Sequence, residues 1–174
     1  DFDEDIIKSI KQYINGINKI SNERIYEEIK KTFILKNVYT LFSNKTSKEI
    51  ILNIFPQFKY YERLKNINFL RDKVNFDKDS FLILALLILD ETSDYEYFCH
   101  KYKTSNKTKD RFKNISTNFK NIKSKKFYTE KNIRKLIYLS NRDHVKDLLL
   151  FSVCLNNKID IEKLINFANS CDIP

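Results

Sequence analysis

Positively charged side chains are concentrated in one stretch of this 174-residue chain. Residues 101–135 hold 13 lysines and arginines against two acidic residues, a net charge of +11, whereas residues 1–100 and 136–174 each carry a net charge of −1. A lysine-rich composition would spread lysines evenly, so it explains their number but not their placement. Clustered lysines and arginines bind phosphate groups. The stretch therefore predicts a polyanionic partner.

Eleven of these cations are the candidate binding residues. Phe112, Ile115 and Phe119 form the apolar face of a helix that Ser105 caps, which leaves the basic positions of that helix toward solvent or its boundary. The following loop, and a helix that starts at Thr129, extend the basic segment. The candidates are Lys107, Lys109, Arg111, Lys113, Lys120, Lys123, Lys125, Lys126, Lys131, Arg134 and Lys135.

Contacts of this kind would read the shape and backbone of a nucleic acid rather than its base sequence, which favours a folded RNA. If about five of the cations met phosphates of a duplex, log affinity would fall against log salt with a slope of roughly −4.5. Two alternatives remain open. The lysine-rich face could be solvated without a ligand, and Phe127 and Tyr128 could be core residues instead of stacking on a base.

Signals for catalysis are weak. His100 and His144 have no ligand spacing with a cysteine or carboxylate and are interpreted as surface or boundary residues. The acidic run at residues 3–5 could suggest a metal, but helix capping explains it more simply. One glycine cannot form a glycine-rich phosphate loop. The cysteines are Cys99, Cys154 and Cys171; their odd number predicts buried thiols in a reducing cytosol, with a disulfide or metal site as the alternative.

The elements that must position these residues are predicted to be helices. Apolar residues recur with helical periodicity and no run alternates like a strand, so the expected fold is all-α, with about ten helices. The best-defined helix covers residues 22–35. Ser21 is its expected N-cap, Ile20 and Ile25 are spaced as a hydrophobic staple, and Ile29 and Phe33 continue the apolar face.

Capping residues and breakers delimit the other expected helices. The first is a helix that Asp3 caps and Gly16 ends in a left-handed conformation. Short helices are expected at residues 38–43 and 48–55, a helical run at 58–73, and a buried helix at 81–89 that Asp77 or Asp79 caps. Further helices are expected to start at Ser93, Ser105, Thr129 and Asp160, with another buried helix around 145–152. The apolar run at 81–89 is too short to span a bilayer, so no membrane partner is expected. Residues 1–73 and 74–174 are the expected subdivisions of one continuous helical unit.

Four stretches also resemble a known family in their order along the chain. They are the acidic segment at residues 1–5, Ser-x-Glu-Arg-Ile at 21–25 followed by Glu-Glu-Ile-Lys-Lys at 27–31, Ile-Phe-Pro at 54–56, and Tyr-Lys-Thr-Ser-Asn-Lys at 102–107. Together they resemble the neck, body and tail of the class II tRNA nucleotidyltransferases, which include CCA-adding enzymes and bacterial poly(A) polymerases.

The resemblance implies an RNA-holding region without the catalytic head. A CCA-adding parent would use Mg and CTP or ATP in that head, and the sequence motifs of the head are absent here. By the same resemblance, this fragment would carry no cofactor and be inactive alone. It would bind tRNA or another structured RNA and be cytoplasmic. Ser21, Glu23, Arg24 and Glu27 match the neck motif, whose implied role is structural support, although Arg24 and Glu27 could form a plain intrahelical ion pair. The alternatives are a poly(A) polymerase and a helical interaction domain whose basic face meets an acidic protein or a membrane surface.

Overall fold

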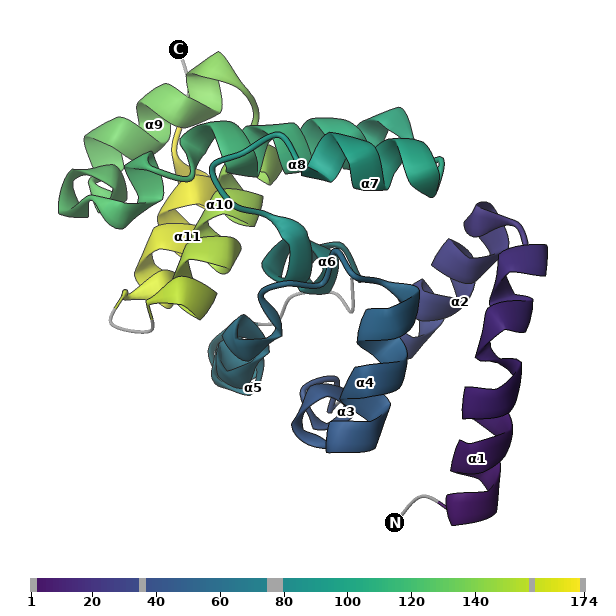
Figure 1. Cartoon of the computed structure of the whole chain (residues 1–174). Coiled ribbons are helices and arrows are strands. Elements are labelled where there is room, and N and C mark those ends of the chain that lie inside the picture. Colours follow the sequence, from purple (N-terminus) through teal and green to yellow (C-terminus); the bar gives the residue numbers. More distant parts are fainter. Residues whose placement is uncertain (1–2, 35–36, 75–79, 157–158, 173–174) are drawn as a thin grey trace.

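The computed structural model describes residues 3–34, 37–74, 80–156 and 159–172, and every regular element within these ranges is helical (Figure 1). The all-α prediction is therefore confirmed. The α-helices are α1 (Glu4–Tyr13), α2 (Asn22–Phe33), α3 (Thr40–Ser43), α4 (Lys45–Ile54), α5 (Ile67–Lys73), α6 (Ser80–Ile88), α7 (Tyr95–Lys101), α8 (Asn106–Asn118), α9 (Glu130–Leu139), α10 (Arg142–Leu155) and α11 (Ile161–Ser170). The 3-10 helices are η1 (Ile14–Lys19), η2 (Tyr61–Asn66), η3 (Asn121–Lys123) and η4 (Lys125–Tyr128).

Side-chain caps begin five of the α-helices where the sequence predicts them. Ser21 Oγ accepts a hydrogen bond from the Arg24 N–H at 3.3 Å, and Asp3 caps α1 by accepting from the Asp5 N–H at 2.9 Å. Ser105, Thr129 and Asp160 cap α8, α9 and α11 in the same way. These caps satisfy backbone donors that a helix start leaves without partners, so polar residues at these positions decide where each helix begins.

Three expected helix boundaries are wrong. Gly16 does not end α1 in a left-handed conformation, because the chain tightens into η1 and no glycine of the described residues has a positive φ. Helix α4 begins at Lys45 rather than residue 48, since Asn44 caps it. Ser93 does not cap α7, whose N-cap is Asp94 without a side-chain hydrogen bond. The expected caps Asp77 and Asp79 lie outside the described residues.

The expected helical run at residues 58–73 is a turn, the 3-10 helix η2 and the short helix α5. Its apolar residues are Phe58, Tyr61, Leu64, Ile67 and Leu70, which recur every third residue. A spacing of three is the period of a 3-10 helix, whereas an α-helical face alternates steps of three and four. The same spacing continues into the α-helix α5, so it does not by itself show where the 3-10 helix lies.

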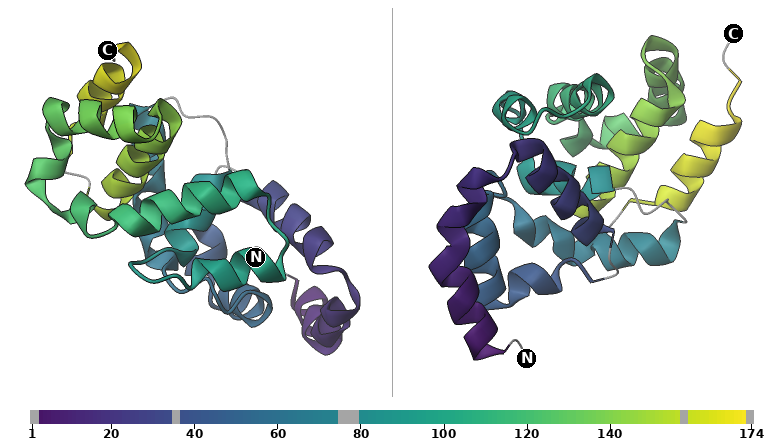
Figure 2. Two further views of the ribbon diagram at one scale, coloured as in Figure 1. Left: turned by 90° about the horizontal axis from the view of Figure 1, so that it is seen from above. Right: turned by 90° about the vertical axis from the view of Figure 1, so that its right-hand side faces the viewer.

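Helices α6 and α10 occupy the middle of the molecule. Every residue of α6 is buried. Residues at the start of η2 donate hydrogen bonds to carbonyls at the C-terminal end of α6. The Tyr60 N–H donates to the Leu87 carbonyl at 3.1 Å, and Arg63 Nη1 donates to the Leu89 carbonyl at 2.6 Å. Helix α10 packs against α6, α8, α9 and α11 (Figures 1 and 2). One hydrophobic cluster extends from Tyr26 to Cys171 and crosses the expected subdivision at residue 73.

Candidate functional site

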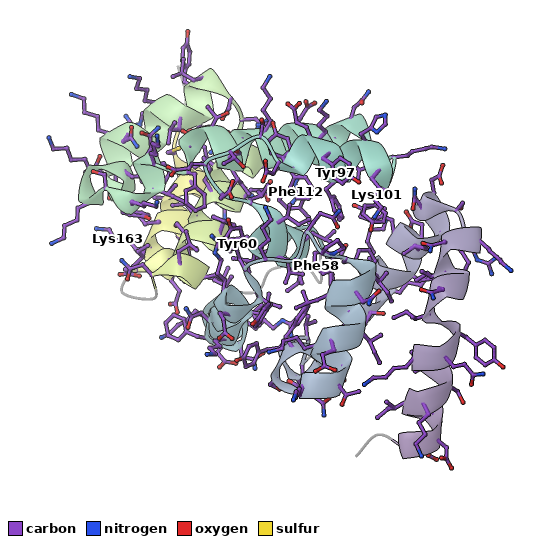
Figure 3. All side chains as sticks on the ribbon, viewed as in Figure 1. Phe58, Tyr60, Tyr97, Lys101, Phe112 and Lys163 are labelled. Atoms are coloured by element: carbon purple, nitrogen blue, oxygen red, sulfur yellow. The ribbon has the colours of Figure 1, made fainter. Side chains whose placement is uncertain are left out.

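Ten of the eleven candidate cations are exposed to solvent. They lie on α8, on a corner made of η3 and η4 (residues 121–128), and on α9. In Figure 1 these elements cover one side of the molecule, and Figure 3 shows many nitrogen-tipped side chains projecting outward around it. The tertiary structure therefore keeps the basic stretch at the surface.

Arg111 is the exception. Its guanidinium forms a bidentate ion pair with the buried Asp147 of α10, with Nε to Oδ2 at 2.7 Å and Nη2 to Oδ1 at 2.8 Å. The same group lies 3.6 Å from the ring centroid of Phe81. These contacts fasten α8 to α10 and to α6, so we remove Arg111 from the RNA-binding candidates and assign it a structural role.

Helix α9 presents the most compact basic surface. At about 100° per residue, Lys131, Arg134 and Lys135 fall within an arc of about 100° that excludes the buried Ile133 and Ile137, with Arg134 at the edge nearer to Ile137. All three side chains are exposed. Tyr138 lies within the same arc and is 68% exposed. We call these four residues the α9 stripe; it offers three cations and one aromatic ring to a partner.

The 3-10 corner carries three further exposed lysines, Lys123, Lys125 and Lys126. Lys123 Nζ lies 4.8 Å from the ring centroid of Phe119, a cation–π contact that restricts where this ammonium group can point. The nearby Lys120 approaches Glu91 at 3.7 Å, but both side chains are largely solvent-exposed, so the pair is weak.

Helix α8 divides its lysines between two sides. Lys109 and Lys113 are four residues apart and share one side, whereas Lys107 lies about 160° around the helix from Lys109. The exposed Asp110 lies between them. Lys107 is therefore separated from the other candidates, while Lys109 and Lys113 flank the same side of α8.

The two aromatic candidates of the corner differ in accessibility. Phe127 is buried and packs edge-on against Tyr128, so it is a core residue. Tyr128 is half-buried, and its hydroxyl donates a hydrogen bond to the Ile122 carbonyl. Burial raises the pKa of this hydroxyl. Only Tyr128 of this pair retains a face toward a pocket, described below.

The neck-motif residues support the start of α2. Ser21 caps the helix, and Glu23 forms an ion pair at 2.5 Å with Lys103, in the turn between α7 and α8. The bond from Lys103 lowers the pKa of the Glu23 carboxyl. Glu27 pairs with Lys30 at 2.7 Å and not with Arg24, so the intrahelical pair considered for Arg24 and Glu27 does not form. Arg24 is exposed.

Three of the four resembling stretches meet in one aromatic cluster. Tyr26, from the neck helix, packs on Tyr102 with ring centroids 6.3 Å apart, and Phe55, from the Ile-Phe-Pro stretch, lies 5.4 Å from the same ring. Phe58 and Phe98 complete the cluster, and Phe58 is fully buried (Figure 3). The stretches that resemble the family thus contribute side chains to the hydrophobic core, which is a structural role.

Among the described residues, no group of three His, Cys, Asp or Glu side chains is arranged to hold a metal ion. Asp3 acts as a helix cap and Asp5 approaches Lys8 at 3.8 Å. The three cysteines are free and buried, and burial raises the pKa of the Cys154 thiol to about 12. A thiol with so high a pKa is a poor nucleophile at neutral pH. No helix in the described part of the chain is long and apolar enough to cross a membrane.

Comparison with known proteins gives one match. Residues 1–62 match the family model described as the probable RNA- and SrmB-binding site of polymerase A. The match shows that residues 1–62 are similar to the RNA-binding region of polymerase A. It covers α1 to α4 and the start of η2, and the basic residues 101–135 lie outside it. No significant match was found to a curated protein or to a solved structure.

Two cations that the sequence analysis did not select also reach this side of the molecule. Arg63, on η2, and Lys163, in the first turn of α11, line a pocket with Lys123 and Lys125. Neither belongs to the basic stretch, and no local pattern connects positions 63, 123 and 163. Only the packing of η2, the corner and α11 against α10 brings them together.

Proposed function

We propose that this protein binds structured RNA, as the C-terminal helical region of a tRNA nucleotidyltransferase that adds CCA to tRNA 3′ ends. The observation that carries the proposal is the gathering of nine exposed cations on α8, the corner and α9; Lys107 is exposed too but lies apart from them on α8. The match of residues 1–62 to an RNA-binding family model supports the same class of partner.

In this proposal the lysines and arginines neutralise phosphates of the acceptor and T arms, and counterions leave the RNA as they do so. The α9 stripe and the corner provide six cations, Lys123, Lys125, Lys126, Lys131, Arg134 and Lys135. Such contacts fix the position of a folded RNA without reading its bases. The aromatic cluster around Tyr102 would keep the RNA-holding surface in place relative to α2.

The chemistry of nucleotide addition is assigned to a catalytic head in the parent protein, which would hold Mg and CTP or ATP. In this proposal the chain contributes RNA binding and no catalytic step. We expect the region alone to bind RNA without extending it. A cytoplasmic location belongs to the same proposal.

Titration of labelled tRNA at increasing salt concentration tests the proposal. About five phosphate contacts give a slope of log affinity against log salt of roughly −4.5. Changing Lys107, Lys109, Lys123 and Lys126 to Glu should weaken binding and make the slope shallower. Negligible affinity at low salt, or affinity that does not respond to salt, would contradict RNA binding by this surface.

A poly(A) polymerase is the second candidate, because the matching family is named for polymerase A. The two are distinguished by comparing tRNA with an unstructured oligo(A) of equal length. Preference for tRNA favours the CCA-adding assignment, whereas equal or tighter binding of oligo(A) favours the polymerase.

A helical interaction domain, with its basic face against an acidic protein or a membrane surface, is the third candidate. Charge reversal would weaken each of these interactions. Competition separates them: tRNA should displace anionic vesicles from the protein if the surface is built for RNA, and should fail to displace them if it is built for lipid.

A further inference from the structure

A pocket of about 840 Å³ opens between the corner, the end of α10 and the start of α11. Its volume lies within the range of sites that enclose small organic ligands, about 300–1,000 Å³. Lys163, labelled in Figure 3, lies on the side of α11 that faces the corner. The pocket therefore lies beside the proposed RNA surface.

Four cations line this pocket. Lys123 and Lys125 come from the corner, Lys163 comes from α11, and the more deeply placed Arg63 comes from η2. Arg63 donates to two carbonyls of the α6 end, and its guanidinium lies 3.9 Å from the ring centroid of Tyr60. Among the described residues it pairs with no carboxylate, so its charge contributes to a positive potential in the pocket.

Acidic groups offset only part of this charge. Asp160 is the one carboxylate among the lining residues, and it already accepts the Lys163 N–H at 3.3 Å as the cap of α11. Glu130 approaches Lys163 Nζ at 3.8 Å, but both side chains are more than half exposed. An anion entering the pocket would therefore meet a net positive surface.

The remaining wall is apolar and aromatic. Phe119, Ile122, Leu155 and Ile159 contribute apolar surface, and Tyr128 contributes its half-buried ring. The Tyr128 hydroxyl is bonded to the Ile122 carbonyl, which holds the ring in place. A fixed ring beside apolar side chains is suited to a flat aromatic group, because base–aromatic stacking tolerates any base.

We propose that this pocket binds one unstacked nucleotide, with the phosphate at Lys123, Lys125 and Lys163 and the base against Tyr128 and the apolar wall. A phosphate alone would leave the apolar wall uncovered, and an uncharged aromatic ligand would leave the net positive charge of the pocket unneutralised. The nucleotide could be free or part of an RNA. Because Lys123 and Lys125 also belong to the RNA surface, the inference rests in part on the proposed function.

The test compares two charge reversals, Lys163→Glu in the pocket and Lys131→Glu on the α9 stripe, in the full chain. Both side chains are exposed, and an acidic residue in the first turn of a helix is compatible with its dipole, so both variants should fold. The probes are AMP, inorganic phosphate, a blunt RNA duplex, and the same duplex with a single-stranded 3′ extension. Isothermal titration calorimetry gives each affinity.

We expect Lys163→Glu to weaken AMP binding at least tenfold and to remove the preference for the extended duplex, while leaving the blunt duplex within twofold. Lys131→Glu should weaken the blunt duplex and leave AMP unchanged. AMP binding without a preference for the extended duplex would identify a free nucleotide as the ligand, and a preference removed by Lys163→Glu would identify the RNA 3′ strand.

Three results would overturn the inference: no AMP binding, AMP binding unaffected by Lys163→Glu, or inorganic phosphate binding as tightly as AMP. If AMP binding fails while the blunt duplex binds, only the pocket assignment fails. If the blunt duplex fails to bind while AMP binds in a Lys163-dependent way, the proposed function fails and the nucleotide pocket stands.

Discussion

Two regions of the chain differ in similarity and in charge: residues 1–62 match a known family, and residues 101–135 carry most of the positive charge. The first region matches a family model described as RNA-binding, yet it holds ten lysines and arginines against nine acidic residues, a net charge of +1. The second lies outside the match and has a net charge of +11. The two regions touch through the Glu23–Lys103 ion pair and the Tyr26–Tyr102 ring contact. The region that matches an RNA-binding family model is therefore not the region that carries most of the positive charge.

Removing an aromatic ring from the scaffold should have the largest effect. Phe58 is fully buried and packs against Phe33, Phe55 and Phe98. Phe58→Ala should lower the free energy of unfolding by about 3–5 kcal/mol, because it leaves a cavity in the cluster. Chemical denaturation measures the change. Tyr13→Ala, at a side chain 71% exposed, is the control and should change it by less than about 0.5 kcal/mol. Equal effects of the two would show that the cluster does not support the fold.

Breaking the Arg111–Asp147 pair should destabilise the basic region by a similar or smaller amount. Asp147→Ala removes the buried carboxylate that holds the guanidinium, at a cost of about 3–5 kcal/mol in unfolding free energy. Lys113→Ala, on the exposed side of the same helix, should be nearly neutral. If Asp147→Ala left stability unchanged and strengthened RNA binding, Arg111 would belong to the binding surface after all.

Charge reversal in each region compares how much each contributes to tRNA affinity. Lys131, Arg134 and Lys135 changed together to Glu should lower tRNA affinity about 100-fold near 0.1 M salt and reduce the salt slope by about 2.7, since each phosphate contact contributes about −0.9. The matched control changes Lys8, Lys11 and Lys19, also exposed, to Glu. A larger loss from this second set would place the RNA on α1 and η1 and reverse the assignment of the two regions.

The smallest expected effect is the pH dependence of the stability that the Glu23–Lys103 ion pair contributes. The pKa of Glu23 is lowered by Lys103, so the pair stabilises the folded chain above the ordinary carboxyl pKa and is lost as pH falls through the lowered value. Glu23→Gln should therefore unfold at slightly lower denaturant concentration than the wild type at pH 7, and the difference should disappear as pH falls through the lowered pKa of Glu23. A difference that does not shrink as pH falls would mean that the pair is not its source.

Much of the scaffold could be predicted from local chemistry. Ser21, Ser105 and Thr129 cap helices at the expected residues, because a hydroxyl bonds the N–H of a neighbour three residues ahead and needs no other part of the protein. The division of residues 58–73 between η2 and α5 could not be predicted, because the same apolar spacing runs through both. The end of α1 could not be predicted either, because a glycine permits the left-handed conformation without requiring it, and Gly16 lies instead within η1.

The segment of the chain that forms the basic surface could be predicted, but the individual residues that belong to it could not. Arg111 is as basic as its neighbours in the sequence, yet the tertiary structure turns it toward Asp147, which is 36 positions away. Lys163 lies 28 positions beyond the last candidate cation, yet it shares a pocket with Lys123 and Lys125. Both outcomes depend on which face of α10 the other helices pack against, and local patterns do not contain that information.

The sequence by itself determined the all-helical fold, the start of five of the helices and the stretch that carries the positive charge, because periodicity, capping and charge act over a few neighbouring residues. Only the tertiary structure decided which cation is tied into the core, which lysines share a helix face and which distant side chains enclose a pocket. Those properties arise when helices pack, and packing joins residues by their distance in space rather than by their distance along the chain.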